Sequence, residues 1–213
     1  MISKIKKNAK LYIFAIILNI SLIGLVAFLL GFQFVNTAQS NKIELENNVA
    51  YEMRPNATEI QKVYFDELKE TFSDVERTDF ERSASIVKNF VADFYTWSNK
   101  RGSYDVGGLE FVYQLSILNI QEGAKNLFYK DLSYYIQQYG AENLPQVAEV
   151  TILSSDYETP LVIGDETFTS FYVVAEWSYV PNSVFDVSQL QTKGYFSVVN
   201  NNGRFELYRY YRE

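Results

Sequence analysis

The sequence contains no histidine and no cysteine, and these two absences exclude much of the common chemistry of enzymes. Without histidine there is no imidazole acid or base, and neither a Ser-His-Asp nor a Cys-His nucleophile can form. Zinc sites of the usual Cys/His type and a disulfide framework are excluded as well. Only a carboxylate site for calcium or magnesium stays open. We predict a protein that is not an enzyme, with no catalytic residues, no cofactor and no metal.

Basic residues are scarce outside the N-terminus. The first 33 residues carry four lysines and no acid, whereas the remainder carries 15 basic and 26 acidic residues, a net charge of −11. Phosphate binding requires clustered lysine and arginine. We therefore expect no direct nucleic-acid binding by the acidic part of the chain.

One long uncharged run, "LYIFAIILNISLIGLVAFLLGF", covers Leu11 to Phe32. A helix needs about 20 apolar residues to cross a bilayer. The lysines before the run place the N-terminus in the cytoplasm by the positive-inside rule. We predict a single-pass protein of the cell membrane, with a cytoplasmic basic tail (1–10), a transmembrane helix (11–33) and an extracytoplasmic remainder. A cleaved signal peptide is the alternative, although its apolar core is typically only about 7–15 residues long.

Small and polar residues inside this run favour self-association. Ala27 and Gly31 form a small-xxx-small pair, and Asn19 can hydrogen-bond across helices. We expect a membrane-embedded homo-oligomer. The residues assigned to the membrane helix are Leu11, Asn19, Gly24, Ala27, Gly31 and Phe32.

Two helices are predicted next. Residues 34–78 form a stalk and a connector helix, in which "ATEIQKVYFDELKETF" has apolar residues every three or four positions. A longer helix then runs from about Phe80 to Lys100, capped by Thr78 or Asp79 and ended by Gly102. Its apolar residues share one broad face: Phe80, Ala84, Val87, Phe90, Val91, Phe94 and Tyr95. Its polar residues, Ser85 and Asn89 among them, fall on the opposite side.

The rest of the chain changes from helical to strand patterns after Pro145. "GGLEFVYQLSILNI" and "GAKNLFYKDLSYYIQQYG" indicate two more helices. Four segments rich in β-branched and aromatic residues follow, and "VVNNNGRFE" is a hairpin signal. We predict an α+β domain at 79–213, in which the long helix and further helices pack on a curved antiparallel sheet of about four strands.

This plan resembles the TcpC-like conjugation proteins of Gram-positive bacteria, which are counterparts of the VirB-eight scaffold protein of type IV secretion systems. The resemblance is carried by the basic N-terminus, the membrane run, the order of elements over residues 80–213, and "FVADFYTW" with an arginine soon after. Its residues are Phe90, Phe94, Tyr95, Trp97 and Arg101. It implies a nuclear-transport-factor-2-like cone fold and a non-enzymatic scaffold that oligomerises and recruits other secretion-channel subunits for DNA transfer.

Several other interpretations compete with the scaffold. A cone fold often has a cavity, so an extracytoplasmic ligand-binding or sensor protein is the main alternative. Ser85 and Lys88 match the S-x-x-K motif of penicillin-binding enzymes, but its partner motifs are absent. The carboxylate pairs Asp156/Glu158 and Asp165/Glu166 fit a solvated loop better than a glycosidase site.

The C-terminal "ELYRYYRE" suggests a contact surface. Simple strand alternation places Tyr208 and Tyr210 on one face, and Tyr beside Arg is a pattern enriched at interfaces. We take Tyr208 and Tyr210 as candidate interface residues.

Overall fold

The structure is a computed structural model that describes residues 42–44 and 50–211 of the chain. The chain divides into two compact units, residues 1–42 and 43–213, and nearly all described residues belong to the second. The predicted membrane helix, with Leu11, Asn19, Gly24, Ala27, Gly31 and Phe32, lies outside the described residues. None of the helices that are described has the length and hydrophobicity that a membrane span requires.

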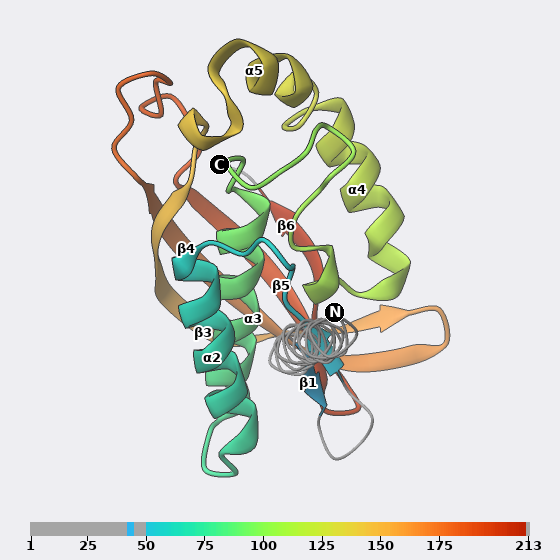
Figure 1. The fold of residues 1–213 in the computed structure, drawn as a ribbon. Coiled ribbons are helices and arrows are strands. Elements are labelled where there is room, and N and C mark those ends of the chain that lie inside the picture. Colours follow the sequence, from blue (N-terminus) through green and yellow to red (C-terminus); the bar gives the residue numbers. More distant parts are fainter. Residues whose placement is uncertain (1–41, 45–49, 212–213) are drawn as a thin grey trace, which may run out of the picture. The chain divides into compact units, whose positions relative to one another are not determined.

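The described residues form an α+β fold with helices first and strands last, as predicted (Figure 1). A small sheet pairs β1 (Lys42–Glu44) with β2 (Ala50–Glu52). The helices are α2 (Glu59–Ser73), α3 (Asp79–Phe94), α4 (Ile117–Asn126) and α5 (Leu132–Tyr139), with short 3-10 turns η1 (Leu109–Phe111), η2 (Gln114–Ser116) and η3 (Ala141–Asn143). The main sheet contains β3 (Val147–Ile163), β4 (Glu166–Tyr179), β5 (Lys193–Asn201) and β6 (Arg204–Tyr211).

The main sheet is an antiparallel meander in the order β3-β4-β5-β6. Asn202 and Gly203 close the β5–β6 hairpin with positive φ angles of 52° and 92°, which confirms the "NNNG" turn signal. The β3–β4 hairpin is longer than expected: β5 pairs with β4 only from Thr169 onward, and the hairpin tip extends beyond the other strands (Figure 1). Asp156 and Glu158 therefore lie in a strand, so the loop predicted for them is wrong.

Helix α3 crosses the sheet and contacts all four strands. Its N-terminus is capped as expected, because Thr78 Oγ1 accepts a hydrogen bond from the amide of Glu81. The helix ends at Phe94, so the end predicted near Lys100 is wrong. The amides of Trp97 and Ser98 instead donate to the carbonyl oxygen of Pro145, at 2.7 and 3.2 Å, just before β3 begins. The chain leaves the helix because it pairs with this distant segment.

Part of the polar side of α3 is buried, which the helical pattern did not predict. Ser85 and Asn89 are only 7% and 4% exposed because α2 lies along this side of α3 (Figure 1). Asn89 Nδ2 donates to the carbonyl oxygens of Tyr64 and Ser85 at 3.0 and 2.9 Å. The helix assigned to a connector thus belongs to the compact unit, and α3 lies between α2 and the sheet.

The two helices predicted between residues 107 and 140 are shorter and shifted. Helix α4 begins only at Ile117, after the two 3-10 turns, and α5 covers only residues 132–139. Tyr129, between them, is fully buried; its hydroxyl donates to the carbonyl oxygen of Phe94 at 2.6 Å. A buried aromatic contact with the end of α3 therefore replaces continuous helix here.

The segment before α2 is attached to the far end of the chain by Tyr51. Its buried hydroxyl donates to the carbonyl oxygen of Phe205 and accepts from the amide of Phe205, both at 3.0 Å. The ring also lies beside Phe72 and Phe111. One side chain thus satisfies two main-chain groups at the start of β6.

We expect Tyr51→Phe to lower the free energy of unfolding by about 1–3 kcal/mol, since it leaves a buried amide and a buried carbonyl without a partner. Chemical denaturation followed by circular dichroism measures the change. Tyr104→Phe is the matched control, because Tyr104 is exposed, and it should change stability by less than about 0.5 kcal/mol. Equal effects of the two variants would contradict the role given to Tyr51.

Candidate functional site

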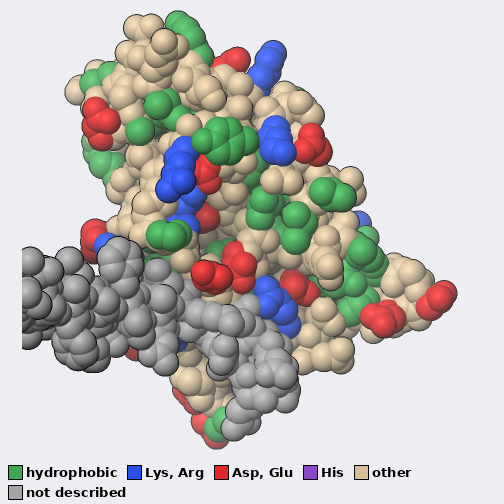
Figure 2. Space-filling view, turned by 45° about the vertical axis from the view of Figure 1, so that its right-hand side comes forward, with side chains coloured by type: hydrophobic (Ala, Val, Ile, Leu, Met, Phe, Trp, Pro, Cys, Tyr) green, Lys and Arg blue, Asp and Glu red, His purple; other side chains and the backbone are tan. Residues whose placement is uncertain are grey.

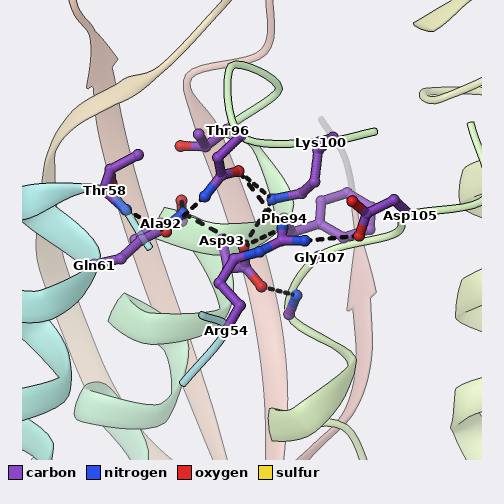
Figure 3. Close-up of polar contacts among 12 residues, drawn as sticks. Arg54, Thr58, Gln61, Ala92, Asp93, Phe94, Thr96, Lys100, Asp105 and Gly107 are labelled. Atoms are coloured by element: carbon purple, nitrogen blue, oxygen red, sulfur yellow. Dashed lines mark hydrogen bonds and ion pairs between the residues drawn. The ribbon is translucent and has the colours of Figure 1, made fainter. Parts of the chain in front are cut away.

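The most unusual polar feature of the described residues is an ion cluster at the carboxyl end of α3 (Figure 3). It consists of Arg54, Asp93, Lys100 and Asp105. Asp93 lies one residue before the end of the helix, where the helix dipole disfavours an anion. The carboxylate therefore needs compensating positive charge from outside the helix.

Asp93 receives that charge from two sides. Its Oδ1 accepts from Lys100 Nζ at 2.7 Å and from Arg54 Nη1 at 3.1 Å. Its Oδ2 accepts from the amide of Gly108 at 2.7 Å. Burial alone would raise the pKa of Asp93, but Lys100 and Arg54 outweigh that effect and hold the pKa below its ordinary value. Asp93 is therefore ionised at neutral pH.

Arg54 joins the two acids of the cluster. Its Nη2 donates to Asp105 Oδ1 at 2.7 Å, and Asp105 Oδ2 accepts from the amide of Arg101 at 2.9 Å. Two positive and two negative charges thus balance within the cluster. In Figure 2 the basic side chains on the visible face likewise lie beside acidic ones.

Lys100 is the deepest member of the cluster, with a side chain that is 0% exposed. Its Nζ also donates to Asn99 Oδ1 at 2.8 Å. Burial lowers the pKa of Lys100 to about 8, although Asp93 opposes this shift. A lysine with a lowered pKa has the chemistry of an amine nucleophile. Here the amine is enclosed and donates to Asp93 and Asn99.

Two glycines allow the loop after Lys100 to reach the helix end. Gly108 has φ +75°, and a Cβ there would lie 2.8 Å from the ring of Phe90. A Cβ at Gly107 would collide with the main-chain carbonyl of Asp93. Only glycine therefore lets the amide of Gly108 approach the Asp93 carboxylate.

The cavity beside the cluster is too small for a substrate. It has a volume of about 30 Å³. That is room for about one water molecule. Polar and apolar side chains line it: Glu52, Met53, Arg54, Gln61, Phe65, Asn89, Asp93, Glu110 and Phe111. Within the described ranges no group of three acidic side chains is arranged to hold a metal ion. The geometry supports a structural role: the cluster joins residues 51–56, the end of α3 and the loop 99–108.

The structure brings most of the resemblance residues together in the core. Phe90, Phe94, Tyr95 and Trp97 are all at most 5% exposed, and their rings contact one another or Phe128. Tyr95 and Trp97 follow the helix instead of lying within it. Arg101 is exposed, and its main-chain amide, rather than its side chain, bonds to Asp105.

The simple alternation predicted for the last strand is wrong. A bulge pairs Val198 with Leu207 but Ser197 with Arg209, so Tyr208 is the extra residue. Tyr210 consequently lies on the α3 side, with its ring 6.0 Å from Phe90 and 5.5 Å from Phe94. Tyr208 lies beside Tyr113. The outward residues are Arg209 and Tyr211.

The S-x-x-K residues are used in packing. Ser85 Oγ donates to the carbonyl oxygen of Arg82, and Lys88 Nζ pairs with Glu67 at 2.7 Å across the α2–α3 contact. This arrangement leaves no base beside the serine. It agrees with the interpretation of these residues as structural.

Sequence reasoning did not single out the ion cluster. The available signals were an aspartate at the end of a helix and the Gly107-Gly108 pair. Arg54 lies 39 residues before Asp93, and no local pattern connects them.

Comparisons with protein-family models, curated proteins and solved structures find no match for this chain.

We expect Asp93→Asn to lower the free energy of unfolding by about 3–5 kcal/mol, because it leaves the buried Lys100 without its counter-charge. Thermal and chemical denaturation of the full-length protein measure the loss. Asp66→Asn is the matched control: Asp66 forms an exposed pair with Lys69, and the change should cost less than about 1 kcal/mol. A loss at Asp93 no larger than the control would refute the structural role.

The lowered pKa of Lys100 predicts a specific pH dependence. Between pH 8 and the ordinary value of 10.5, the unfolded chain binds more protons at this lysine than the folded chain does. The contribution of Lys100 to the free energy of unfolding should therefore rise as the pH rises across that window. Denaturation of the wild type and of Lys100→Met from pH 7 to 10 isolates the contribution. A wild-type curve that falls relative to the variant would contradict the assignment.

Proposed function

We propose that this chain is a non-enzymatic, membrane-anchored scaffold subunit of a bacterial conjugative type IV secretion channel, acting through protein–protein contacts. The proposal extends the resemblance to the TcpC-like and VirB-eight proteins. A long helix that crosses a four-stranded antiparallel meander is compatible with the cone fold that this resemblance implies. One structural observation carries the proposal: the sheet face turned away from α3 carries a group of tyrosine and arginine side chains that are only partly buried.

We call this surface the tyrosine face and define it by Tyr172, Val174, Tyr195, Arg209 and Tyr211. Tyr172 and Tyr195 stack with their ring centroids 6.1 Å apart. The Arg209 guanidinium lies 5.3 Å from the Tyr211 ring centroid. These side chains are half-buried or exposed, whereas their neighbours Phe171, Val173 and Phe196 are buried against α3.

Such a face has the composition of a binding surface. Tyrosine and arginine are the residue types enriched at the energetic centres of interfaces. Strands hold them in fixed directions, so little conformational entropy is lost when a partner docks. The aromatic residues that carry the family resemblance, Phe90, Phe94, Tyr95 and Trp97, are by contrast buried in the core.

The proposed membrane anchor makes weak contacts effective. Copies restricted to one membrane meet at a high effective concentration, so several modest interfaces bind together with greater avidity. The acidic composition disfavours nucleic acid as a partner. Other channel subunits and further copies of the chain are the proposed partners.

A groove near α5 favours a second candidate, a ligand-binding protein. It measures about 410 Å³ and is lined by Trp97, Leu127, Phe128, Asp131, Tyr135 and Leu190. Trp97 Nε1 is buried and has no hydrogen-bond partner among the described residues. A small apolar ligand in contact with these aromatic rings is what the groove would hold.

Mild cross-linking in native membranes, followed by purification of the tagged full-length chain and mass spectrometry, tests the proposal. We expect a transfer ATPase and polytopic channel subunits to be recovered. A chain of residues 1–43 with the same tag is the control for capture by the anchor alone. Recovery of the protein without channel subunits, while a known complex is captured in parallel, would refute the scaffold. A co-purified small molecule that raises the melting temperature would support the ligand-binding candidate.

A further inference from the structure

We infer that the tyrosine face docks on the same face of a second copy of this chain. The inference rests on the proposed function, since a scaffold acts in several copies, and it names the surface that joins them. The observation behind this inference is that the exposed charged side chains on one side of the sheet are basic and those on the other side are acidic.

The exposed charges on the two halves of this face are opposite. Lys193 and Arg209 lie on β5 and β6, whereas Glu158 and Glu176 lie on β3 and β4. Glu206 on β6 is buried and paired with Arg204. Glu176 and Lys193 are direct cross-strand partners, with Oε1 and Nζ 3.4 Å apart. Glu158 Oε1 lies 3.1 Å from Ser197 Oγ and 3.4 Å from Arg209 Nη2. The boundary between the halves runs between β4 and β5.

This division is self-complementary under a two-fold axis. Consider an axis that lies in the plane of contact, runs parallel to the strands and passes between β4 and β5. Rotation about it keeps the position along the strands but exchanges the two sides of the sheet. Each basic half then covers the acidic half of the other copy, and Lys193 of one copy faces Glu176 of its partner. Such isologous pairing is the usual form of a homodimer.

A second copy fits this pattern better than a partner of uniform charge. A basic partner would be attracted to the β3–β4 half and repelled by the β5–β6 half, and an acidic partner would meet the reverse. Elsewhere the domain is strongly acidic, with a net charge of −11 after residue 33, so two copies repel on most approaches. On the tyrosine face, by contrast, the basic half of one copy attracts the acidic half of the other.

The area predicts a weak dimer. Four strands about 4.8 Å apart and eight residues long at about 3.4 Å each give a flat footprint of about 500 Å². Stable interfaces bury about 800 Å² of accessible surface on each partner. The contact therefore depends on the anchor to raise local concentration, and its test belongs in membranes with the full-length chain.

Val174 supplies a cross-linking site at the centre of the face. It pairs with Tyr195 across the boundary between β4 and β5, and the chain contains no natural cysteine. Stacked sheets lie about 10 Å apart, within reach of a short thiol cross-linker. We expect Val174→Cys to give a cross-linked dimer in membranes. Val63→Cys, an exposed position on α2, is the matched control and should give at least several-fold less.

Charge-reversal variants then test whether Lys193 of one copy contacts Glu176 of the other. In the Val174→Cys background, Lys193→Glu alone or Glu176→Lys alone should each reduce the cross-linked dimer several-fold, because like charges face each other. Co-expression of the two differently tagged variants should restore a mixed dimer. Both variants lack the Glu176–Lys193 pair within their own chain, so restoration reports a contact between copies and not recovery of fold stability.

Four results would overturn the inference: no dimer from Val174→Cys, equal dimer from Val63→Cys, no restoration on co-expression, or a cross-link from position 174 to a different protein. In the last case the scaffold function would stand. Restored mixed dimers without any recovered channel subunit would support this interface and refute the proposed function.

Discussion

The position of Asp93 at the carboxyl end of α3 is the constraint on which the rest of this fold depends. The helix dipole and burial both disfavour a carboxylate there, and its ionised form is held by Lys100, Arg54 and the amide of Gly108. Arg54 comes from the chain before α2, and Lys100 and Gly108 come from the two ends of the loop after α3. Satisfying one charge therefore fixes the chain before α2, the loop after α3 and the glycine pair against the same helix end.

Because α3 is buried on both sides, most of its side chains are not accessible to a partner, and the proposed contacts must lie on the surface of the domain. The sheet covers its aromatic side, and α2 covers its polar side through the bonds of Asn89. The cavity at the ion cluster holds about one water molecule. This packing leaves part of the opposite face of the sheet exposed, where Tyr195 and Tyr211 lie.

Local sequence patterns predicted most of the helices and strands. They did not predict where these elements end or which distant residues they contact. The four strands and the Asn202–Gly203 turn follow from alternation and positive φ, which are properties of a few neighbouring residues. The end of α3 depends on Pro145, about fifty residues away, and helical periodicity does not contain it. The bulge at Tyr208 reverses the alternation that follows it, since one extra residue exchanges the two faces of a strand. Arg54 and Asp93 meet only through tertiary contact.

The same contacts relate the start of the described domain to its open sheet face. Tyr51 bonds to the main chain of Phe205 in β6, and Arg54 bonds to Asp93 in α3. The segment that enters the domain is thus bound to an edge strand of the sheet and to the helix that crosses all four strands. The proposed scaffold would need to hold its docking surface in a fixed direction relative to residues 51–54, because orientational freedom weakens multivalent binding. Buried polar bonds are directional and an apolar contact is not, so the bonds of Tyr51 and Arg54 would supply that fixed direction.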